Sequence, residues 1–192
     1  MSRLPSIPFY TKNATVCSMN DLASLESGVT HITVSNNCGN ENMAIGLYFT
    51  RFTQLKEVVI GDDCFMNVDQ LNLIGLSKLR SVVIGSNSFT KKKNGFGKES
   101  NRRFFVKNCP SLRELRIGRY SFSDYVSAVI EGNDALEVIA MGELSSESFN
   151  FYSASLELKS VGWMECVRGR FAESEIGCVR CVRFPRRQCE CV

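Results

Sequence analysis

The stretch LRELRIG, residues Leu112 to Gly118, returns in closely related form at three other places in the chain. The copies are LKEVVIG from Leu55, LRSVVIG from Leu79 and LEVIAMG from Leu136. Their starts lie 79 − 55 = 24, 112 − 79 = 33 and 136 − 112 = 24 residues apart, so one interval is nine residues longer. Self-similarity at a period of about 20–50 residues is typical of stacked repeats, in which no repeat buries its own apolar face. We therefore expect a repeat array over residues 22–162.

Each copy has the alternation of a short strand. Leucine stands first and aliphatic residues stand fourth and sixth, so the last two side chains share one strand face. Glycine stands seventh, as expected at a sharp corner where a Cβ would clash or φ is positive. A phenylalanine follows four residues later, and we expect its ring to fill the interior. The positions are Leu55/Val58/Ile60/Gly61, Leu79/Val82/Ile84/Gly85, Leu112/Leu115/Ile117/Gly118 and Leu136/Ile139/Met141/Gly142, then Phe65, Phe89, Phe122 and, after a small insertion, Phe149.

A second short alternation precedes the next repeat each time. Its apolar pairs are Leu47/Phe49, Leu71/Leu73, Phe104/Val106, Ala128/Ile130 and Leu156/Leu158. Two short strands per repeat would stack into two narrow parallel sheets with a shared apolar interior. A fainter first repeat has Val29, Ile32 and Val34 at matching positions. The predicted fold class is a β-rich solenoid of about five coils, with short parallel strands and little helix.

The pattern L-x-x-[VIL]-x-[VIL] followed by G-x-x-[SC]-F, and the phrase NCPSL at Asn108–Leu112, resemble leucine-rich repeats. The resemblance is closest to the BspA-like type of bacterial and protist proteins, and it covers roughly residues 22–162. It implies a leucine-rich-repeat solenoid that serves as a binding scaffold. The asparagine that commoner leucine-rich repeats place ninth occurs only as Asn87, where other units have Asp63, Tyr120 and Leu144. We therefore expect no asparagine ladder.

Composition places the chain among ordinary soluble proteins. It has 192 residues, of which 44% are hydrophobic and 22% charged, and its net charge of +3 is too small to argue for nucleic acid or a membrane surface. No apolar stretch has the length of a signal peptide core or a membrane span. We expect a cytoplasmic protein whose nine cysteines are mostly reduced. The sequon Asn13-Ala-Thr15 is then an unmodified polar loop within an irregular N-terminal lead or cap, residues 1–21.

The nine extra residues fall in a basic loop, residues 90–103. One interpretation is a solvated, mobile loop extruded from one coil. The other is a docking site for an acidic partner or for phosphate, which keeps a phosphate or nucleic-acid binder among the alternatives. Six basic residues oppose the single acid Glu99: Lys91, Lys92, Lys93, Lys98, Arg102 and Arg103.

Residues 163–192 form a tail rich in cysteine and arginine, where the repeat register fails after Val161. Four thiols in Cys178-x-x-Cys181 and Cys189-x-Cys191 leave a zinc-binding adaptor as an alternative function. The spacer between the pairs is short for a structural zinc site, so we expect free thiols without metal. We also expect Trp163 to cover the last intact coil, because an open end of stacked strands needs capping.

The sequence carries no constellation that supports catalysis, and we expect no enzymatic activity and no cofactor. The single histidine, His31, has an outward position without a linked nucleophile. Cys64 and Cys109 occupy apolar or small repeat positions and are interpreted as core residues, while Cys17 and Cys38 stand singly.

Outward positions of the repeated strands form the candidate partner-binding strip. It combines two apolar side chains with five basic ones: Lys56, Val59, Arg80, Val83, Arg113, Arg116 and Arg119. One interpretation is a solvated face with cross-strand pairs of basic residues and glutamates. The other is the extended surface that solenoids use to bind partners. The function that we predict is a non-enzymatic scaffold for another protein.

Overall fold

The computed structural model describes residues 12–41, 46–91, 100–142, 149–152, 154–161, 166–168 and 179–182. Within these ranges the chain is mostly strand, and its helix is the six-residue α1 (Met19–Ser24). None of the described helical segments is long and apolar enough to cross a membrane.

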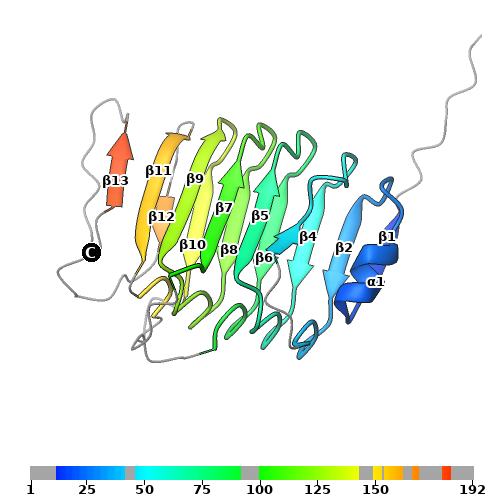
Figure 1. Ribbon diagram of the computed structural model, residues 1–192. Coiled ribbons are helices and arrows are strands. Elements are labelled where there is room, and N and C mark those ends of the chain that lie inside the picture. Colours follow the sequence, from blue (N-terminus) through cyan, green and yellow to red (C-terminus); the bar gives the residue numbers. More distant parts are fainter. Residues whose placement is uncertain are drawn as a thin grey trace, which may run out of the picture.

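The strands form two parallel sheets. Sheet A has seven strands in the order β1 (Asn13–Val16), β2 (His31–Val34), β4 (Glu57–Ile60), β6 (Ser81–Ile84), β8 (Glu114–Ile117), β10 (Val138–Met141) and β12 (Cys166–Arg168). Sheet B has six, in the order β3 (Gly46–Tyr48), β5 (Gln70–Ile74), β7 (Arg103–Lys107), β9 (Ser127–Asn133), β11 (Ser155–Val161) and β13 (Val179–Val182). From β2 onward the chain alternates between the sheets, so spatial neighbours in one sheet are separated by a strand of the other (Figure 1). The prediction of two parallel sheets with little helix is confirmed.

The apolar core lies between the two sheets. The predicted inward residues of sheet A are at most 3% exposed, and one continuous cluster joins them to the inward residues of sheet B. Strand register explains this, because Val58 lies opposite Val82 and Val82 opposite Leu115, so inward positions coincide across neighbouring strands. The residues that the sequence predicts to point inward are therefore the ones that are buried. The inward residues are Val58, Ile60, Val82, Ile84, Leu115, Ile117, Ile139 and Met141 from sheet A, and Leu47, Leu71, Leu73, Phe104, Val106, Ala128, Ile130, Leu156 and Leu158 from sheet B.

A stack of phenylalanine rings runs through this core across successive units. Ring centroids are 5.3 Å apart between Phe65 and Phe89, 4.8 Å between Phe89 and Phe122, and 5.0 Å between Phe122 and Phe151. All four residues have positive φ, from 51° to 61°, a conformation that costs a non-glycine residue about 1–3 kcal/mol. Burial of a phenylalanine side chain contributes a similar amount, about 1.5–3 kcal/mol, and therefore offsets this cost.

The prediction that Phe149 fills the interior is wrong. Phe149 does not join it but stacks on Tyr120 outside, with centroids 5.7 Å apart, and Phe151 takes the interior place at 3% exposure. The insertion in this unit is longer than we assumed by two residues, which moves the interior ring from 149 to 151.

A ladder of short polar side chains takes the place of the asparagine ladder, one position before each interior ring. Each side chain donates to a corner carbonyl of the preceding unit: the Ser88 hydroxyl to Gly61 O at 2.8 Å and the Ser121 hydroxyl to Gly85 O at 2.7 Å. Ser88 N–H in turn donates to Ser121 Oγ at 3.0 Å, and the Cys64 thiol continues the ladder to Ser35 O. Corner groups that would otherwise be buried and unpaired are satisfied in this way.

Glycine at the corners is required by close approach of the backbone. A Cβ on Gly118 would lie 2.5 Å from the carbonyl carbon of Gly85 and from Ser86 N. A contact this short with backbone atoms has no room to relax, so successive corners pack directly on one another. Of the two reasons considered for the repeated glycine, the clash applies here, and positive φ applies at Gly142, where φ is 63°.

The N-terminal segment is more regular than expected. Residues 13–16 form β1, which pairs in parallel with β2, and α1 follows with a capping box formed by Ser18 and Asp21. The Asp21 carboxylate accepts the N–H groups of Cys17 and Ser18, and these bonds lower its pKa. The sequon Asn13-Ala-Thr15 is therefore part of an edge strand and not of a loop.

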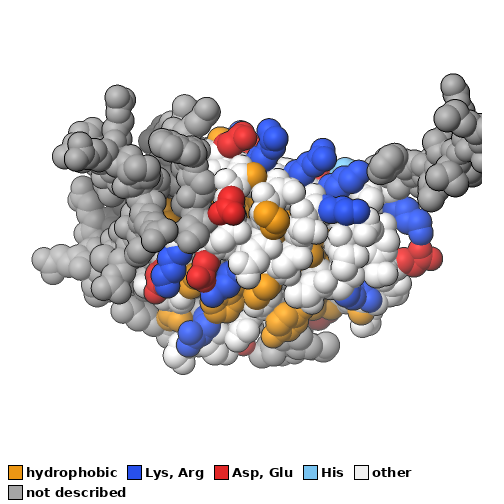
Figure 2. Space-filling model, turned by 90° about the horizontal axis from the view of Figure 1, so that it is seen from above, with side chains coloured by type: hydrophobic (Ala, Val, Ile, Leu, Met, Phe, Trp, Pro, Cys, Tyr) orange, Lys and Arg blue, Asp and Glu red, His pale blue; other side chains and the backbone are white. Residues whose placement is uncertain are grey.

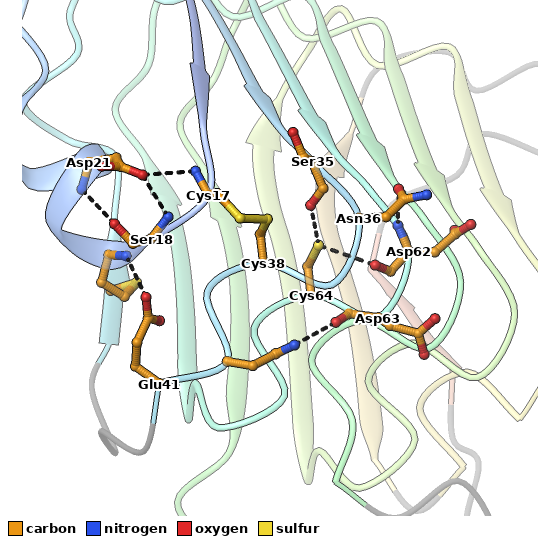
Figure 3. The surroundings of a disulfide bond; sticks show 12 residues. Cys17, Ser18, Asp21, Ser35, Asn36, Cys38, Glu41, Asp62, Asp63 and Cys64 are labelled. Atoms are coloured by element: carbon orange, nitrogen blue, oxygen red, sulfur yellow. Dashed lines mark hydrogen bonds between the residues drawn. A yellow bond between two sulfur atoms is a disulfide. The ribbon is translucent and has the colours of Figure 1, made fainter.

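Cys17 and Cys38 form a disulfide, with Cα atoms 4.7 Å apart (Figure 3). The expectation that these cysteines stand singly and reduced is wrong for this pair. Cys38 stands at the position in its unit that Cys64 has in the next unit. Cys17 follows β1, at the corner where the polar ladder would otherwise have an acceptor carbonyl. Disulfides are typical of oxidising compartments, which runs against the expected cytoplasmic location.

The two sheets continue beyond the predicted end of the array. β12 pairs in parallel with β10, and β13 with β11, so the alternation between the sheets extends through residue 182. The prediction that the register ends after Val161 is therefore wrong for the backbone. Trp163, Cys178 and the Cys189-x-Cys191 pair lie outside the described residues.

The phenylalanine stack yields a stability prediction. Phe122→Ala removes a ring that contacts Phe89, Phe104 and Phe151, and loss of such a core ring costs about 3–5 kcal/mol. Urea-induced unfolding measures the loss. The matched control is Tyr48→Ala, at a side chain that is 54% exposed, and an equal loss in the two variants would contradict the role of the stack.

The disulfide yields a second prediction. Cys17→Ser should lower the free energy of unfolding by roughly 3 kcal/mol, the chain-entropy value for a cross-link that closes a loop of about this size. Cys64→Ser is the control and should have little effect, because Ser88 and Ser121 show that serine suits this ladder position. Alkylation of the denatured, unreduced protein should label Cys64 and Cys109 but leave Cys17 and Cys38 unlabelled, as read by peptide mass spectrometry.

Candidate interaction surface

The outward face of sheet A carries two rows of side chains that the register aligns. One row contains His31, Glu57, Ser81, Glu114 and Val138, and the other contains Thr33, Val59, Val83, Arg116 and Ala140. Val59 and Val83 are half-buried and directly opposite each other on neighbouring strands. The middle of this face is therefore made of short side chains, with longer charged ones around them.

The structure brings most of the predicted strip together. Arg80 N–H donates to Lys56 O at 2.8 Å, and Arg113 N–H donates to Arg80 O at 2.9 Å, so these three residues follow one another along the edge where the strands begin. Arg116 lies in the valine row on β8. Arg119 lies beyond the opposite ends of the strands, after the Gly118 corner. The strip is thus a valine centre with basic residues on two sides.

Several charges of this face are neutralised within it. Arg113 Nη1 lies 3.5 Å from Glu137 Oε1, Arg116 Nε donates to Glu114 Oε1 at 2.5 Å, and His31 Nε2 lies 3.7 Å from Glu57 Oε2. Such exposed pairs contribute about 0–1 kcal/mol each to stability. The interpretation as a face with cross-strand charge pairs therefore holds for Arg113, whereas Arg116 pairs with Glu114 on its own strand, β8.

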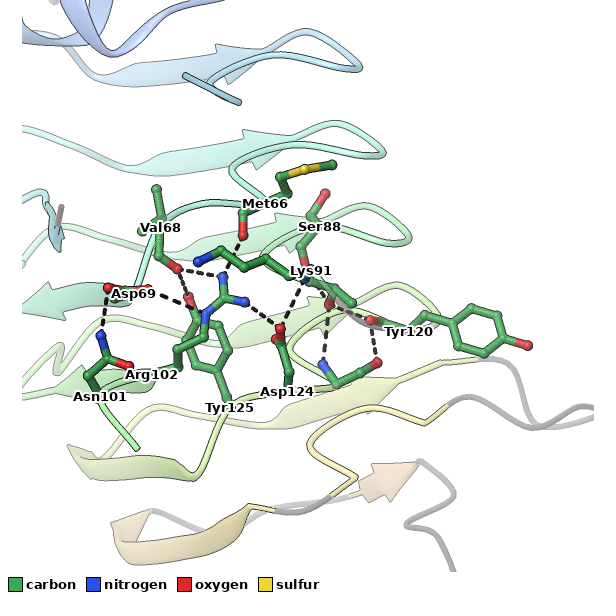
Figure 4. A network of polar contacts seen from close by, with 12 residues as sticks. Met66, Val68, Asp69, Ser88, Lys91, Asn101, Arg102, Tyr120, Asp124 and Tyr125 are labelled. Carbon is green, nitrogen blue, oxygen red and sulfur yellow. Dashed lines mark hydrogen bonds and ion pairs between the residues drawn. The ribbon is translucent and has the colours of Figure 1, made fainter. Parts of the chain in front are cut away.

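Arg102 was expected in the solvated basic loop, and this prediction is wrong. Its side chain is fully buried, and the guanidinium donates to Asp124 Oδ2 at 2.6 Å and to the carbonyls of Met66 and Val68 at 2.6 and 2.8 Å (Figure 4). The guanidinium carbon also lies 4.8 Å from the ring centroid of Tyr125. A buried cation must be paired and hydrogen-bonded, and these groups supply partners for both terminal nitrogens. Within the described residues Nε makes no hydrogen bond but lies 3.7 Å from Asp69 Oδ1.

Asp124 ties both ends of the basic loop to the next unit. Its Oδ2 accepts from Lys91 N–H at 3.1 Å as well as from Arg102. Asn101 donates to Asp69 Oδ2 at 2.8 Å, and Arg103 is exposed at the start of β7. Residues 92–99, which include Lys92, Lys93 and Lys98, lie outside the described part of the chain. The loop stems are thus built into the core.

The described free cysteines do not have the properties of nucleophiles. Cys64 and Cys109 are completely buried, and burial raises the pKa of the Cys109 thiol to about 11 and that of Cys64 above its usual range. A thiol is reactive as the thiolate, so both are protonated and inert at neutral pH. Among the described residues there is no group of three or more His, Cys, Asp or Glu side chains that could hold a metal ion.

Sequence reasoning missed a row of three apolar side chains and one asparagine on the outward face of sheet B. Tyr48, Asn72, Phe105 and Val129 lie in register there, and Tyr48 is 54% exposed. Asn72 is 4% exposed, and its Nδ2 has no hydrogen-bond partner among the described residues. The sequence did contain the signal in the second short alternation. Tyr48 lies between the inward residues Leu47 and Phe49, and Phe105 lies between Phe104 and Val106.

Comparison with known proteins found no matching family model, no matching curated protein and no matching solved structure.

The buried ion pair yields a prediction with a neighbouring control. Arg102→Leu leaves Asp124 buried without its cation, which costs about 3–5 kcal/mol of unfolding free energy. Arg103→Leu changes an exposed side chain at the next position and should stay within about 0.5 kcal/mol of the parent protein. Chemical denaturation of the two variants measures both values, and similar losses would show that the pair is not what holds the loop stems.

Proposed function

We propose that this protein is a non-enzymatic scaffold of the leucine-rich-repeat-like solenoid type, which binds another protein on the outward face of sheet A. The observation that carries the proposal is the position of Val59 and Val83. Two half-buried aliphatic side chains lie side by side on neighbouring strands of the outward face of sheet A. Apolar surface with a charged rim is the usual composition of a protein-binding patch.

The solenoid part of the proposal is supported by the repeated path of the chain. Strands alternate between the sheets, corner glycines pack on one another, and one interior ring follows each of several corners. This path repeats with the spacing of the LRELRIG motif, which also carried the resemblance to BspA-like leucine-rich repeats. An array of this kind offers its stacked strands as one extended surface.

Paired charges around the valines suit a role in specificity more than in affinity. Arg113–Glu137 and Arg116–Glu114 place both signs next to the apolar centre. Charges at the rim of an interface steer association and exclude wrong partners, while the buried centre supplies most of the binding energy. A protein partner would therefore need an apolar contact for the valines and charges that match this rim.

Site-specific photo-cross-linking in native lysate tests the proposal. A photoreactive amino acid at Val83 should trap one reproducible protein, whereas the same residue at Ser155, on the exposed face of sheet B, should not trap that protein. Val59→Glu should abolish the Val83 product, because a charge in the apolar centre cannot be desolvated without cost. Equal cross-linking from Val83 and Ser155 would contradict binding on sheet A.

A further inference from the structure

The tripeptide Asn13-Ala14-Thr15 is the only match in the sequence to the acceptor pattern for N-linked glycosylation, which is Asn, any residue except Pro, then Ser or Thr. A pattern this short also occurs by chance, so the folded structure has to show that the Asn can carry a sugar chain. A glycan is bulky and strongly hydrated, and it therefore needs an Asn side chain that points into solvent.

Asn13 lies at the start of β1 with its side chain on the outward face of sheet A. Alternation along the strand directs Ala14 and Val16 to the core, where Ala14 packs against the buried cluster and Val16 is 3% exposed. Asn13 and Thr15 occupy the opposite positions, and both are exposed. The folded protein therefore holds the Asn13 side chain on its surface, where an attached glycan would not disturb the core.

The surroundings of Asn13 on sheet A are polar. Strand register places Asn13 opposite His31 and continues this row through Glu57 and Ser81, whereas the valines belong to the other outward row. Figure 2 looks onto the turns from which the strands of sheet A begin. It shows charged side chains at the N-terminal end of the described surface and hydrophobic ones mostly nearer the middle. A hydrated sugar chain on Asn13 would therefore adjoin polar surface.

Strand formation alone does not account for Asn13. Asn is depleted in β-strands, and β1 is already held by its pairing with β2 and by the buried Val16. Thr15 has a structural role of its own, because it lies opposite Thr33 and threonines suit such cross-strand pairs. Among the described strands β1 is also at the edge of sheet A, and natural proteins block such edges against pairing with other chains. A glycan on Asn13 would add bulk beside this edge.

The disulfide between Cys17 and Cys38 is a second, independent observation. Cys17 directly follows β1, so the sequon and the bond lie in the same short segment. Disulfides form and persist in oxidising compartments, among them the lumen of the endoplasmic reticulum. N-linked glycosylation belongs to the same pathway, because its acceptor pattern is used in secreted proteins. The expectation of an unmodified sequon depended on a cytoplasmic location, and the disulfide runs against that location.

We propose that Asn13 is an N-glycosylation site, which carries an oligosaccharide on the outward face of sheet A. The co-reactant is an oligosaccharide linked to a lipid through pyrophosphate. The Asn13 amide nitrogen forms a bond to the anomeric carbon of the sugar and gives up one proton, while the bond from that carbon to the pyrophosphate breaks and the lipid pyrophosphate leaves with the electron pair. Because transfer takes place on the unfolded chain, the pairing of β1 with β2 does not block it.

Mass spectrometry of the protein purified from the cells that produce it tests the site directly. A peptide N-glycosidase releases the sugar and converts the modified Asn into Asp. In heavy-oxygen water the peptide that contains residue 13 should therefore gain a labelled Asp, and the whole protein should migrate faster on a denaturing gel. The same sample without the glycosidase is the control and should gain no label.

Thr15→Ser and Thr15→Ala form a matched pair of variants, because the first keeps the acceptor pattern and the second removes it. Produced in the same cells, Thr15→Ser should keep the glycosidase-sensitive shift in mobility, whereas Thr15→Ala and Asn13→Gln should lose it. Alkylation that leaves Cys17 and Cys38 unlabelled in each variant shows that a lost shift does not come from a failure to fold.

An unmodified Asn13 in protein that contains the Cys17–Cys38 disulfide would overturn the site, as would a shift that persists in both Thr15→Ala and Asn13→Gln. An unmodified Asn13 together with reduced Cys17 and Cys38 would overturn the oxidising compartment as well. Cross-linking from Val83 requires no glycan, so either result leaves the proposed function standing.

Discussion

The parallel pairing of strands across units is the constraint on which the rest of this structure depends. A strand such as β6 finds its backbone partners in β4 and β8, which belong to the preceding and following units. Because neither unit can satisfy these groups alone, the register between units must be kept at every step. The phenylalanine stack, the serine and cysteine ladder and the corner glycines each maintain that register at a different point of the path.

The same register creates the candidate binding surface. Val59 and Val83 are 24 residues apart in the chain and become neighbours only because β4 and β6 pair without a shift. The turns that lead from sheet B into sheet A are brought together in the same way. A one-residue slip would turn the valines inward and the core residues outward, so stability and binding depend on one alignment.

The sequence predicted the interior well because the interior repeats. Val58, Ile60, Val82 and Ile84 follow a spacing of two within each strand, and burial selects aliphatic residues at those positions in every unit. Phe149 was misassigned because the insertion before it has no counterpart in the other units. The strands β1 and β13 were missed for a related reason, since their segments lack the leucine and glycine of the repeat and their pairing partners alone make them strands.

Features that depend on a partner distant in sequence could not be predicted from local patterns. Arg102 looks like any other cation in a basic loop until Asp124, from the next unit, is placed beside it. Pairing of Cys17 with Cys38 likewise required the position of β1, which composition does not reveal. For the surface, the sequence indicated which residues face outward, but the pairing of Arg113 with Glu137 depends on a contact that only the fold supplies.

The most direct test of the account is the distance between genetically encoded spin labels at Thr33 and Ala140, measured by pulsed electron paramagnetic resonance. These residues occupy the same outward row on β2 and β10, and β4, β6 and β8 lie between them. Four steps at the usual strand spacing of about 4.8 Å place the two backbone sites about 19 Å apart. A single narrow distribution near this value, allowing for the length of the labels, is the predicted result. A broad distribution, or one centred far from it, would contradict the parallel register on which both the core and the surface depend.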